Sequence, residues 1–128
     1  MPMTALVVDD SMLIRYTVSQ FLARRGFVVE SASNGEEALE AVARVIPTLV
    51  ITDMVMPRMS GAELISALKS KPETASVPVI ILAYKAGIGQ VEKDVSFAIY
   101  KDIDIEAQLG RALDAVLGKM GQKSVSRD

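Results

Sequence analysis

The stretch from Leu49 to Gly61 constrains the fold of this chain more than any other. It begins with an apolar, β-branched run that ends in one carboxylate, Asp53, and it continues through a loop with a proline into a helix start. A run that is apolar on both faces predicts a central strand of a parallel sheet, buried by helices on each side. Asp53 then lies at the carboxyl end of that strand, where ligand sites form in open α/β sheets. Taken alone, Asp53 is equally consistent with a strand end that caps a turn.

The composition excludes several classes of function. The 128 residues are half hydrophobic and carry a net charge of −2, which predicts one folded domain and argues against a nucleic-acid-binding surface. The chain has neither cysteine nor histidine, which excludes disulfides, thiolate or histidine–zinc sites and serine–histidine catalysis. Site chemistry must therefore use carboxylates, lysines, hydroxyls and the backbone. Without a signal-peptide pattern or an apolar run of membrane-spanning length, we expect a cytoplasmic protein that does not bind a membrane.

Short apolar runs alternate with helix patterns along the whole chain. We expect strands at residues 5–8, 27–32, 49–53, 77–83 and 96–101. We expect helices from Ser11 to about Arg25, from Asn34 to before Pro47, from Ser60 through Leu68, and from Asp104 to Gly118. Residues 69–76 read as a loop, and the two glycines within residues 84–95 leave only a short or irregular helix there.

This alternation predicts the fold class. Five strands and about five helices imply right-handed crossovers and a doubly wound, five-stranded parallel sheet with helices on both faces. Sheets of this size commonly have the flavodoxin-like strand order 2-1-3-4-5. We expect a single domain over residues 1–118, followed by a polar C-terminal tail over residues 119–128. The capping-box patterns Asn34 to Glu37 and Ser60 to Glu63 mark the starts of two of the helices.

The predicted topology gathers charged residues at one edge of the sheet. The first strand ends in Asp9 and Asp10, and the third ends in Asp53. Three carboxylates in one crevice repel one another and need a cation or a raised pKa, and oxygen ligands suit magnesium or calcium. Lys101, at the end of the fifth strand, adds positive charge. Each residue alone has an ordinary explanation, a helix cap or a solvated strand end, but all four at one edge make coincidence improbable. A carboxylate beside a hard divalent ion and a lysine can also act as a nucleophile toward phosphorus.

These motifs resemble the receiver domain of response regulators in two-component signal transduction, in particular the stand-alone, chemotaxis-regulator type. The resemblance covers roughly residues 4–118 and rests on Val7–Ser11, on Asp53–Pro57 with Gly61, and on Lys101, in this order. It implies a phosphoprotein that takes a phosphoryl group from a histidine kinase or a phosphotransfer protein in a phosphorelay. Such a protein is a phosphoacceptor, with its own phosphoryl transfer and self-dephosphorylation, and not an enzyme in the usual sense.

The resemblance also assigns roles to individual residues. Asp53 matches the phosphoacceptor, and Lys101 would contact the phosphoryl group. Mg²⁺ would be bound directly by Asp10, mostly through water by Asp9, and also by Asp53 and the backbone carbonyl of Val55.

The chain departs from the family pattern at the switch positions. Ala83 stands where the family normally has a threonine or serine that donates to the phosphoryl group, and Ala98 replaces the switch aromatic. Asp102 replaces the usual proline after the lysine. Tyr84 follows Ala83, but strand alternation points its side chain to the other face. Lys85 is a candidate to contact the phosphoryl group in place of the lost hydroxyl.

Two functional hypotheses remain open at this point. The first is a single-domain response regulator that is phosphorylated at Asp53, switches atypically and signals by contact with an unknown downstream protein. The second is a receiver-like interaction module with vestigial phosphorylation that binds its partner constitutively, as the missing side chains of Ala83 and Ala98 suggest. A flavodoxin-like enzyme is a weaker third reading, because no phosphate-cradling loop follows the first strand. A homodimer through the last helix is conceivable, although no specific residue supports it.

Overall fold

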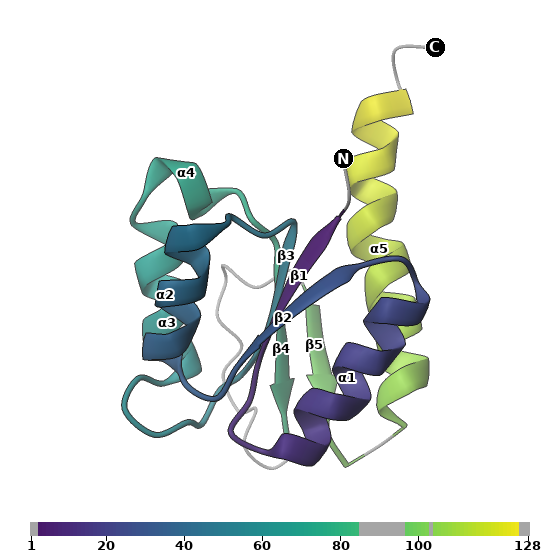
Figure 1. Cartoon of the computed structure of the whole chain (residues 1–128). Coiled ribbons are helices and arrows are strands. Elements are labelled where there is room, and N and C mark those ends of the chain that lie inside the picture. The colour runs from purple at the N-terminus through teal and green to yellow at the C-terminus, as the bar shows by residue number, and fades with distance from the viewer. Residues whose placement is uncertain (1–2, 85–96, 103, 126–128) are drawn as a thin grey trace.

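The computed structural model describes residues 3–84, 97–102 and 104–125 (Figure 1). Within these residues, five parallel strands form one sheet in the order β2-β1-β3-β4-β5, which confirms the predicted fold class. The strands are β1 (Thr4–Val8), β2 (Val28–Ala32), β3 (Leu49–Asp53), β4 (Val79–Ala83) and β5 (Phe97–Tyr100). Because β1 lies between β2 and β3, the direction of winding changes there, and a crevice forms beyond the carboxyl ends of β1 and β3.

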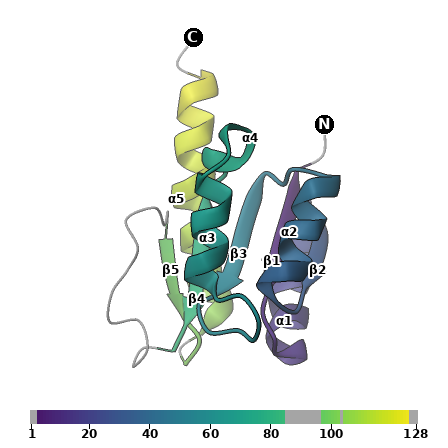
Figure 2. The same ribbon diagram turned by 90° about the vertical axis from the view of Figure 1, so that its left-hand side faces the viewer.

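Helices cover both faces of the sheet (Figures 1 and 2). They are α1 (Met12–Arg24), α2 (Gly35–Arg44), α3 (Gly61–Lys69), α4 (Pro72–Ala75) and α5 (Ile105–Val125). α1 and α5 lie on one face, and α2 and α3 lie on the other. Among the described residues, no helix combines the length and the apolar character that crossing a membrane would require.

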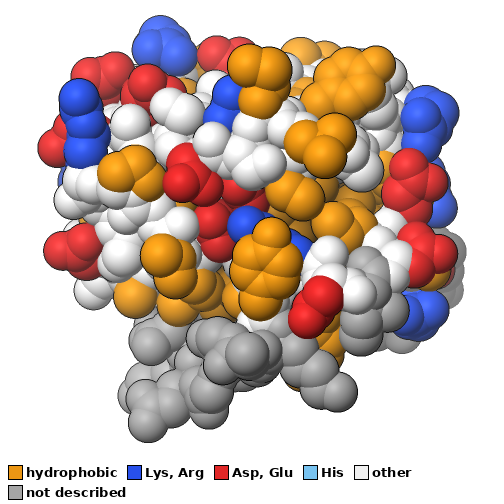
Figure 3. All heavy atoms as spheres, turned by 90° about the horizontal axis from the view of Figure 1, so that it is seen from below, with side chains coloured by type: hydrophobic (Ala, Val, Ile, Leu, Met, Phe, Trp, Pro, Cys, Tyr) orange, Lys and Arg blue, Asp and Glu red, His pale blue; other side chains and the backbone are white. Residues whose placement is uncertain are grey.

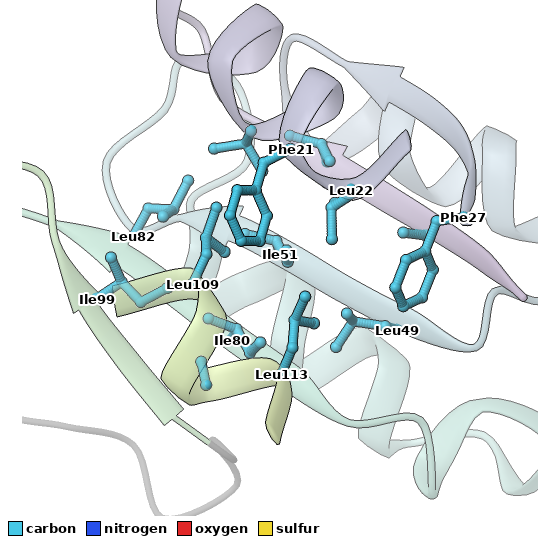
Figure 4. Close-up of a cluster of buried hydrophobic side chains, with 14 of the residues drawn as sticks. Phe21, Leu22, Phe27, Leu49, Ile51, Ile80, Leu82, Ile99, Leu109 and Leu113 are labelled. Atoms are coloured by element: carbon cyan, nitrogen blue, oxygen red, sulfur yellow. The ribbon is translucent and has the colours of Figure 1, made fainter. Parts of the chain in front are cut away.

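Two hydrophobic clusters, one on each face, explain why the third strand carries apolar residues on both of its faces. On the first face, side chains of α1 and α5 pack on the sheet (Figure 4); they include Phe21, Leu22, Leu109 and Leu113 against Leu49, Ile51, Ile80 and Ile99. On the second face, α2 and α3 cover the alternate residues, among them Val42, Leu64 and Ile65 against Leu6, Val50 and Ile81. Each fully buried side chain of this kind contributes about 1.5–3 kcal/mol. β3 is therefore buried along its length, and its one carboxylate lies at the end.

The helix starts follow the predicted caps, with one difference. The side chains of Ser11, Asn34 and Ser60 each accept a hydrogen bond from a backbone N–H of the following helix, and Ser60 forms a complete capping box with Glu63. The capping box predicted at Asn34 is only half right. The Glu37 carboxylate accepts from the backbone and hydroxyl of Ser33, one residue before the cap, and these hydrogen bonds lower the pKa of Glu37.

Two further predictions about the helices are wrong. Residues 69–76 are not wholly a loop, because Pro72–Ala75 form the single helical turn α4, which begins with a proline at its first position. The last helix continues through Gly118 to Val125, so the end predicted at Gly118 is wrong. The division into a domain over residues 1–118 and a polar tail over residues 119–128 stays a prediction. A glycine inside a helix costs only about 1 kcal/mol, which its neighbours can offset.

Gly61, the first residue of α3, lies directly against the backbone that carries Asp53. Its N–H donates to the carbonyl of Met54 at 3.0 Å. A Cβ atom at Gly61 would overlap the carbonyl oxygen of Asp53 and would lie 2.8 Å from the Cα of Met54. The close approach of α3 to the end of β3 therefore requires a residue without a side chain.

We predict that Gly61→Ala lowers the free energy of unfolding by about 2 kcal/mol, because the added methyl group meets backbone that cannot move aside. The measurement is urea denaturation. Gly118→Ala is the matched control, because a Cβ at Gly118 meets no atom within 4 Å, and there the substitution should stabilise the helix by about 0.5–1 kcal/mol. Equal effects of the two substitutions would contradict the packing argument.

Candidate functional site

Three carboxylates meet in the crevice beyond the carboxyl ends of β1 and β3. Asp9 and Asp10 follow the last residue of β1 directly, and Asp53 is the last residue of β3. One carboxylate oxygen from each lies within 4.8 Å of the others. Asp9 and Asp53 are buried, and Asp10 is exposed at the mouth of the crevice. The structure thus brings together the three acidic residues that the sequence places at this edge.

The ammonium group of Lys101 lies between the two buried carboxylates. Its Nζ is 2.8 Å from Oδ2 of Asp9 and 3.2 Å from Oδ1 of Asp53, and its side chain is only 6% exposed. Lys101 directly follows β5, and its backbone N–H donates to the carbonyl of Ala83 at the end of β4 at 2.8 Å. The fourth residue singled out by the sequence is therefore part of the same cluster.

Burial and mutual repulsion shape the protonation of this cluster. Burial raises the pKa of Asp53, the nearby negative charge of Asp9 raises it further, and Lys101 only partly opposes them. Burial alone would lower the pKa of Lys101, but its contacts with Asp9 and Asp53 outweigh this and leave the pKa raised. Lys101 is therefore held as a cation, while the ionised form of Asp53 is disfavoured until more positive charge arrives.

The cluster fits a hard divalent cation. Oδ2 of Asp9 is buried and, among the described residues, receives no hydrogen bond beyond its ion pair with Lys101. The three side chains offer only oxygen ligands, which is the donor set that Mg²⁺ prefers. The N–H of Val55 donates to Oδ1 of Asp53 at 3.4 Å, and the side chain of Val55 points into solvent. A ligand role for the Val55 carbonyl stays a prediction.

An open cleft of about 340 Å³ leads to the cluster. Its lining consists of Asp10, Ser11, Asp53, Met54, Val55, Ala83, Tyr84 and Lys101. Figure 3, which views the carboxyl end of the sheet, shows acidic and basic side chains meeting near the middle of this face with hydrophobic side chains around them.

Tyr84 corrects one sequence prediction. Its side chain does not point to the other face of the sheet but lines the cleft, with Nζ of Lys101 5.4 Å from the ring centroid. β4 ends at Ala83, so strand alternation no longer determines the direction of the next side chain. The side chain of Tyr84 is exposed, and its ring lies where a cation–π contact with Lys101 is favourable.

The switch positions are small side chains in packed surroundings. Ala83 is buried at the floor of the cleft, and Ala98 is half buried in β5. Neither side chain can donate a hydrogen bond. Lys85, the candidate for replacing the lost hydroxyl, lies outside the described residues.

Arg15 is a site residue that the sequence did not reveal. Its Nη1 donates to the backbone carbonyl of Asp9 at 2.6 Å, while the N–H of Ser11 donates to Oδ1 of Asp9 at 2.8 Å. These two contacts hold the turn that presents Asp9 and Asp10. The sequence feature that could have indicated this role is a basic residue near the start of a predicted helix, because its side chain points back toward the preceding loop.

The fold and the cleft define a doubly wound α/β domain with an acidic cation site at its switch point. The model of the response regulator receiver domain matches residues 5–108, and the chain belongs to this family. The chain is 33% identical over 90 residues to the response regulator MprA of Mycolicibacterium vanbaalenii, covering 70% of this chain and 38% of that protein. It is 28% identical over 127 residues to the hybrid signal transduction histidine kinase D of Dictyostelium discoideum, covering 96% of this chain and 8% of the kinase.

Solved structures share the fold over most of the chain. The chemotaxis response regulator CheY4 of Vibrio cholerae is 26% identical with a TM-score of 0.79, and the match covers 90% of this chain and 99% of that one. The receiver domain of the sensor histidine kinase PA1611 from Pseudomonas aeruginosa is 20% identical with a TM-score of 0.80, covering 92% and 99%. At 20% identity, the likeness to this second structure concerns the fold alone. The second structure has a magnesium ion coordinated in its active-site cleft.

We predict that Asp53→Asn raises the free energy of unfolding of the metal-free protein at pH 7 by about 1 kcal/mol or more, because it removes a buried like charge beside Asp9. Folding raises the pKa of Asp53, so protonation favours the folded state. Ionised Asp53 lowers the free energy of unfolding, and this loss is fully present above the pKa of Asp53 in the folded protein. The loss disappears as the pH falls from that pKa toward the ordinary pKa of Asp53 in the unfolded chain. The difference in free energy of unfolding between Asp53→Asn and the wild type should therefore shrink as the pH falls between these two pKa values.

Urea denaturation at several pH values in the presence of a chelator measures this difference. Lys101→Met is the control of opposite sign, because it leaves two buried carboxylates without a cation and should cost about 3 kcal/mol. A loss of stability in Asp53→Asn at pH 7 would contradict the charge balance described here.

Proposed function

We propose that the chain is a response regulator receiver that accepts a phosphoryl group on Asp53 from a histidine kinase or a phosphotransfer protein, with Mg²⁺ bound, and that it acts in the cytoplasm through contacts with another protein. The observation that carries this proposal is the approach of the Lys101 ammonium to within 3.2 Å of Oδ1 of Asp53. This pair lies at the bottom of a cleft that also presents Asp10.

The chemistry follows from the charges around Asp53. A carboxylate oxygen of Asp53 attacks the phosphorus of a phosphohistidine, a P–O bond forms, the P–N bond breaks, and the imidazole leaves with the electron pair and takes up a proton. Lys101 supplies fixed positive charge next to the reacting oxygens. Mg²⁺, held by Asp9, Asp10, Asp53 and the Val55 carbonyl, would neutralise charge on the phosphoryl oxygens.

The protein donor must cover the rim of the cleft, because Asp53 is only 6% exposed at its floor. α1 begins next to this floor and exposes three large hydrophobic side chains, Met12, Leu13 and Tyr16. Exposed apolar groups beside a reactive centre are typical of a surface that a partner covers. They support a protein, and not only a small molecule, as the phosphoryl donor.

A second candidate function rests on Ala83 and Ala98. Both positions lack the side chains through which the family couples phosphorylation to the fifth strand and to the helix that precedes it. A receiver-like module that binds its partner without phosphorylation would need neither of these two side chains. The two functions differ in whether Asp53 reacts.

We predict that the wild-type protein gains one phosphoryl group when it is incubated with Mg²⁺ and a small acyl phosphate or phosphoramidate. Intact mass spectrometry measures the adduct. Asp53→Asn is the control, and it should gain nothing because it lacks the attacking carboxylate. An unmodified wild-type protein that still binds Mg²⁺ would contradict the proposal and favour the constitutive module.

We predict that the double substitution Met12→Ser and Tyr16→Ser slows transfer about 10-fold or more from a phosphorylated histidine phosphotransfer protein that reacts with the wild type, because it removes hot-spot-sized apolar contacts. The reaction with the small donor should be unchanged. Val28→Ser with Val45→Ser is the matched control, since these residues are similarly exposed, but Val28 begins β2 and Val45 caps the end of α2, at the opposite edge of the sheet from the cleft. Equal slowing in the control would argue against a donor surface on α1.

A further inference from the structure

Gln108 is a buried polar side chain that the proposed chemistry does not use. It lies in the first turns of α5 and is 7% exposed. Its Oε1 accepts a hydrogen bond from the N–H of Tyr100 at 3.0 Å, and its Nε2 donates to the carbonyl of Tyr100 at 2.8 Å and to that of Asp104 at 3.2 Å. Both ends of the amide are thus bonded to the backbone at the end of β5.

The position of β5 explains why such an amide is needed there. β5 is an edge strand of the described sheet and pairs with β4 on one side. Successive residues of a strand direct their backbone groups to opposite sides. The N–H of Lys101 points toward β4, where it donates to Ala83, so the groups of Tyr100 point outward and meet Gln108. The side-chain amide takes the place of a neighbouring strand for this one residue.

This arrangement fixes the backbone immediately before Lys101 from both sides. The carbonyl of Ala83 holds the β4 side, and the amide of Gln108 holds the outer side. α5 itself is anchored in the core through Leu109 and Leu113. The ammonium of Lys101 must reach two carboxylates at 2.8 and 3.2 Å, and a misplacement of about 1 Å in such a site can cost about 100-fold in rate.

We propose that Gln108 is a positioning residue, which clamps Tyr100 and thereby fixes Lys101 against Asp53 for phosphoryl transfer. The effect on transfer rests on the function proposed above. The effect on the position of Lys101 does not, because it is already present in the unmodified protein.

The test compares two substitutions that each remove buried side-chain hydrogen bonds to the backbone. Gln108→Leu keeps the bulk of the side chain but removes the bonds to Tyr100. Thr74→Val is the control, because the hydroxyl of Thr74 is buried and donates to the carbonyl of Leu68 at 2.5 Å, on the opposite face of the sheet from α5. Both variants lose stability, but only the first touches the support of Lys101.

Two measurements separate positioning from stability. In the metal-free protein, nitrogen NMR of the Lys101 ammonium should show a distinct, slowly exchanging signal in the wild type and in Thr74→Val. In Gln108→Leu the signal should move to that of exposed lysines. With Mg²⁺ and saturating small donor, Gln108→Leu should lower the phosphorylation rate about 10-fold while changing the affinity for Mg²⁺ and the KM for the donor less than about twofold.

An unchanged Lys101 signal in folded Gln108→Leu would overturn the proposal, and so would an equal loss of rate in Thr74→Val. A wild-type protein that is never phosphorylated would overturn the proposed function, while the ammonium signal would still decide whether Gln108 positions Lys101. If Gln108→Leu does not fold, Gln108→Asn is used for the same comparison, because its shorter amide cannot reach both groups of Tyr100.

Discussion

Two buried carboxylates, Asp9 and Asp53, share one ammonium group at the carboxyl edge of the sheet. Like charges about 4 Å apart near a protein surface repel by about 4 kcal/mol, and burial adds a cost for each ion. Lys101 compensates part of this, yet the pKa of Asp53 stays raised. The unmodified site is therefore short of positive charge, which is consistent with the divalent cation and the phosphoryl group of the function proposed above.

The rest of the fold holds these charged side chains close together through contacts to the backbone on which they are carried. The fully buried strand β3 puts Asp53 at its end, and Gly61 lets α3 pack against the same backbone. Arg15 donates a hydrogen bond to the carbonyl of Asp9, and the amide of Gln108 forms hydrogen bonds with the backbone of Tyr100, the residue before Lys101. Each charged side chain of the cluster is thus backed by a contact to its own or its neighbour's backbone, which keeps the site preorganised.

The sequence predicted what depends on periodicity and order, and it missed what depends on tertiary contact. The strand order and the meeting of Asp9, Asp10 and Asp53 followed from alternating patterns, because parallel strands bring their carboxyl ends to one edge. The path of Tyr84 beyond the end of β4 could not be predicted, since alternation stops where the strand does. Gln108 gave no signal, because a polar residue in a helix is normally exposed, and its burial follows from its hydrogen bonds to the outer backbone groups of Tyr100 at the edge of the described sheet.

The most direct test of this account is the dependence of the free energy of unfolding on Mg²⁺ concentration. A cation that binds only the folded state stabilises it by about 1.4 kcal/mol for each tenfold increase above its Kd. We predict this rise for the wild-type protein and a nearly flat response for Asp53→Asn, with Na⁺ added at equal ionic strength as the control. The same rise in Asp53→Asn, or none in the wild type, would contradict the claim that the buried carboxylates form a site short of positive charge.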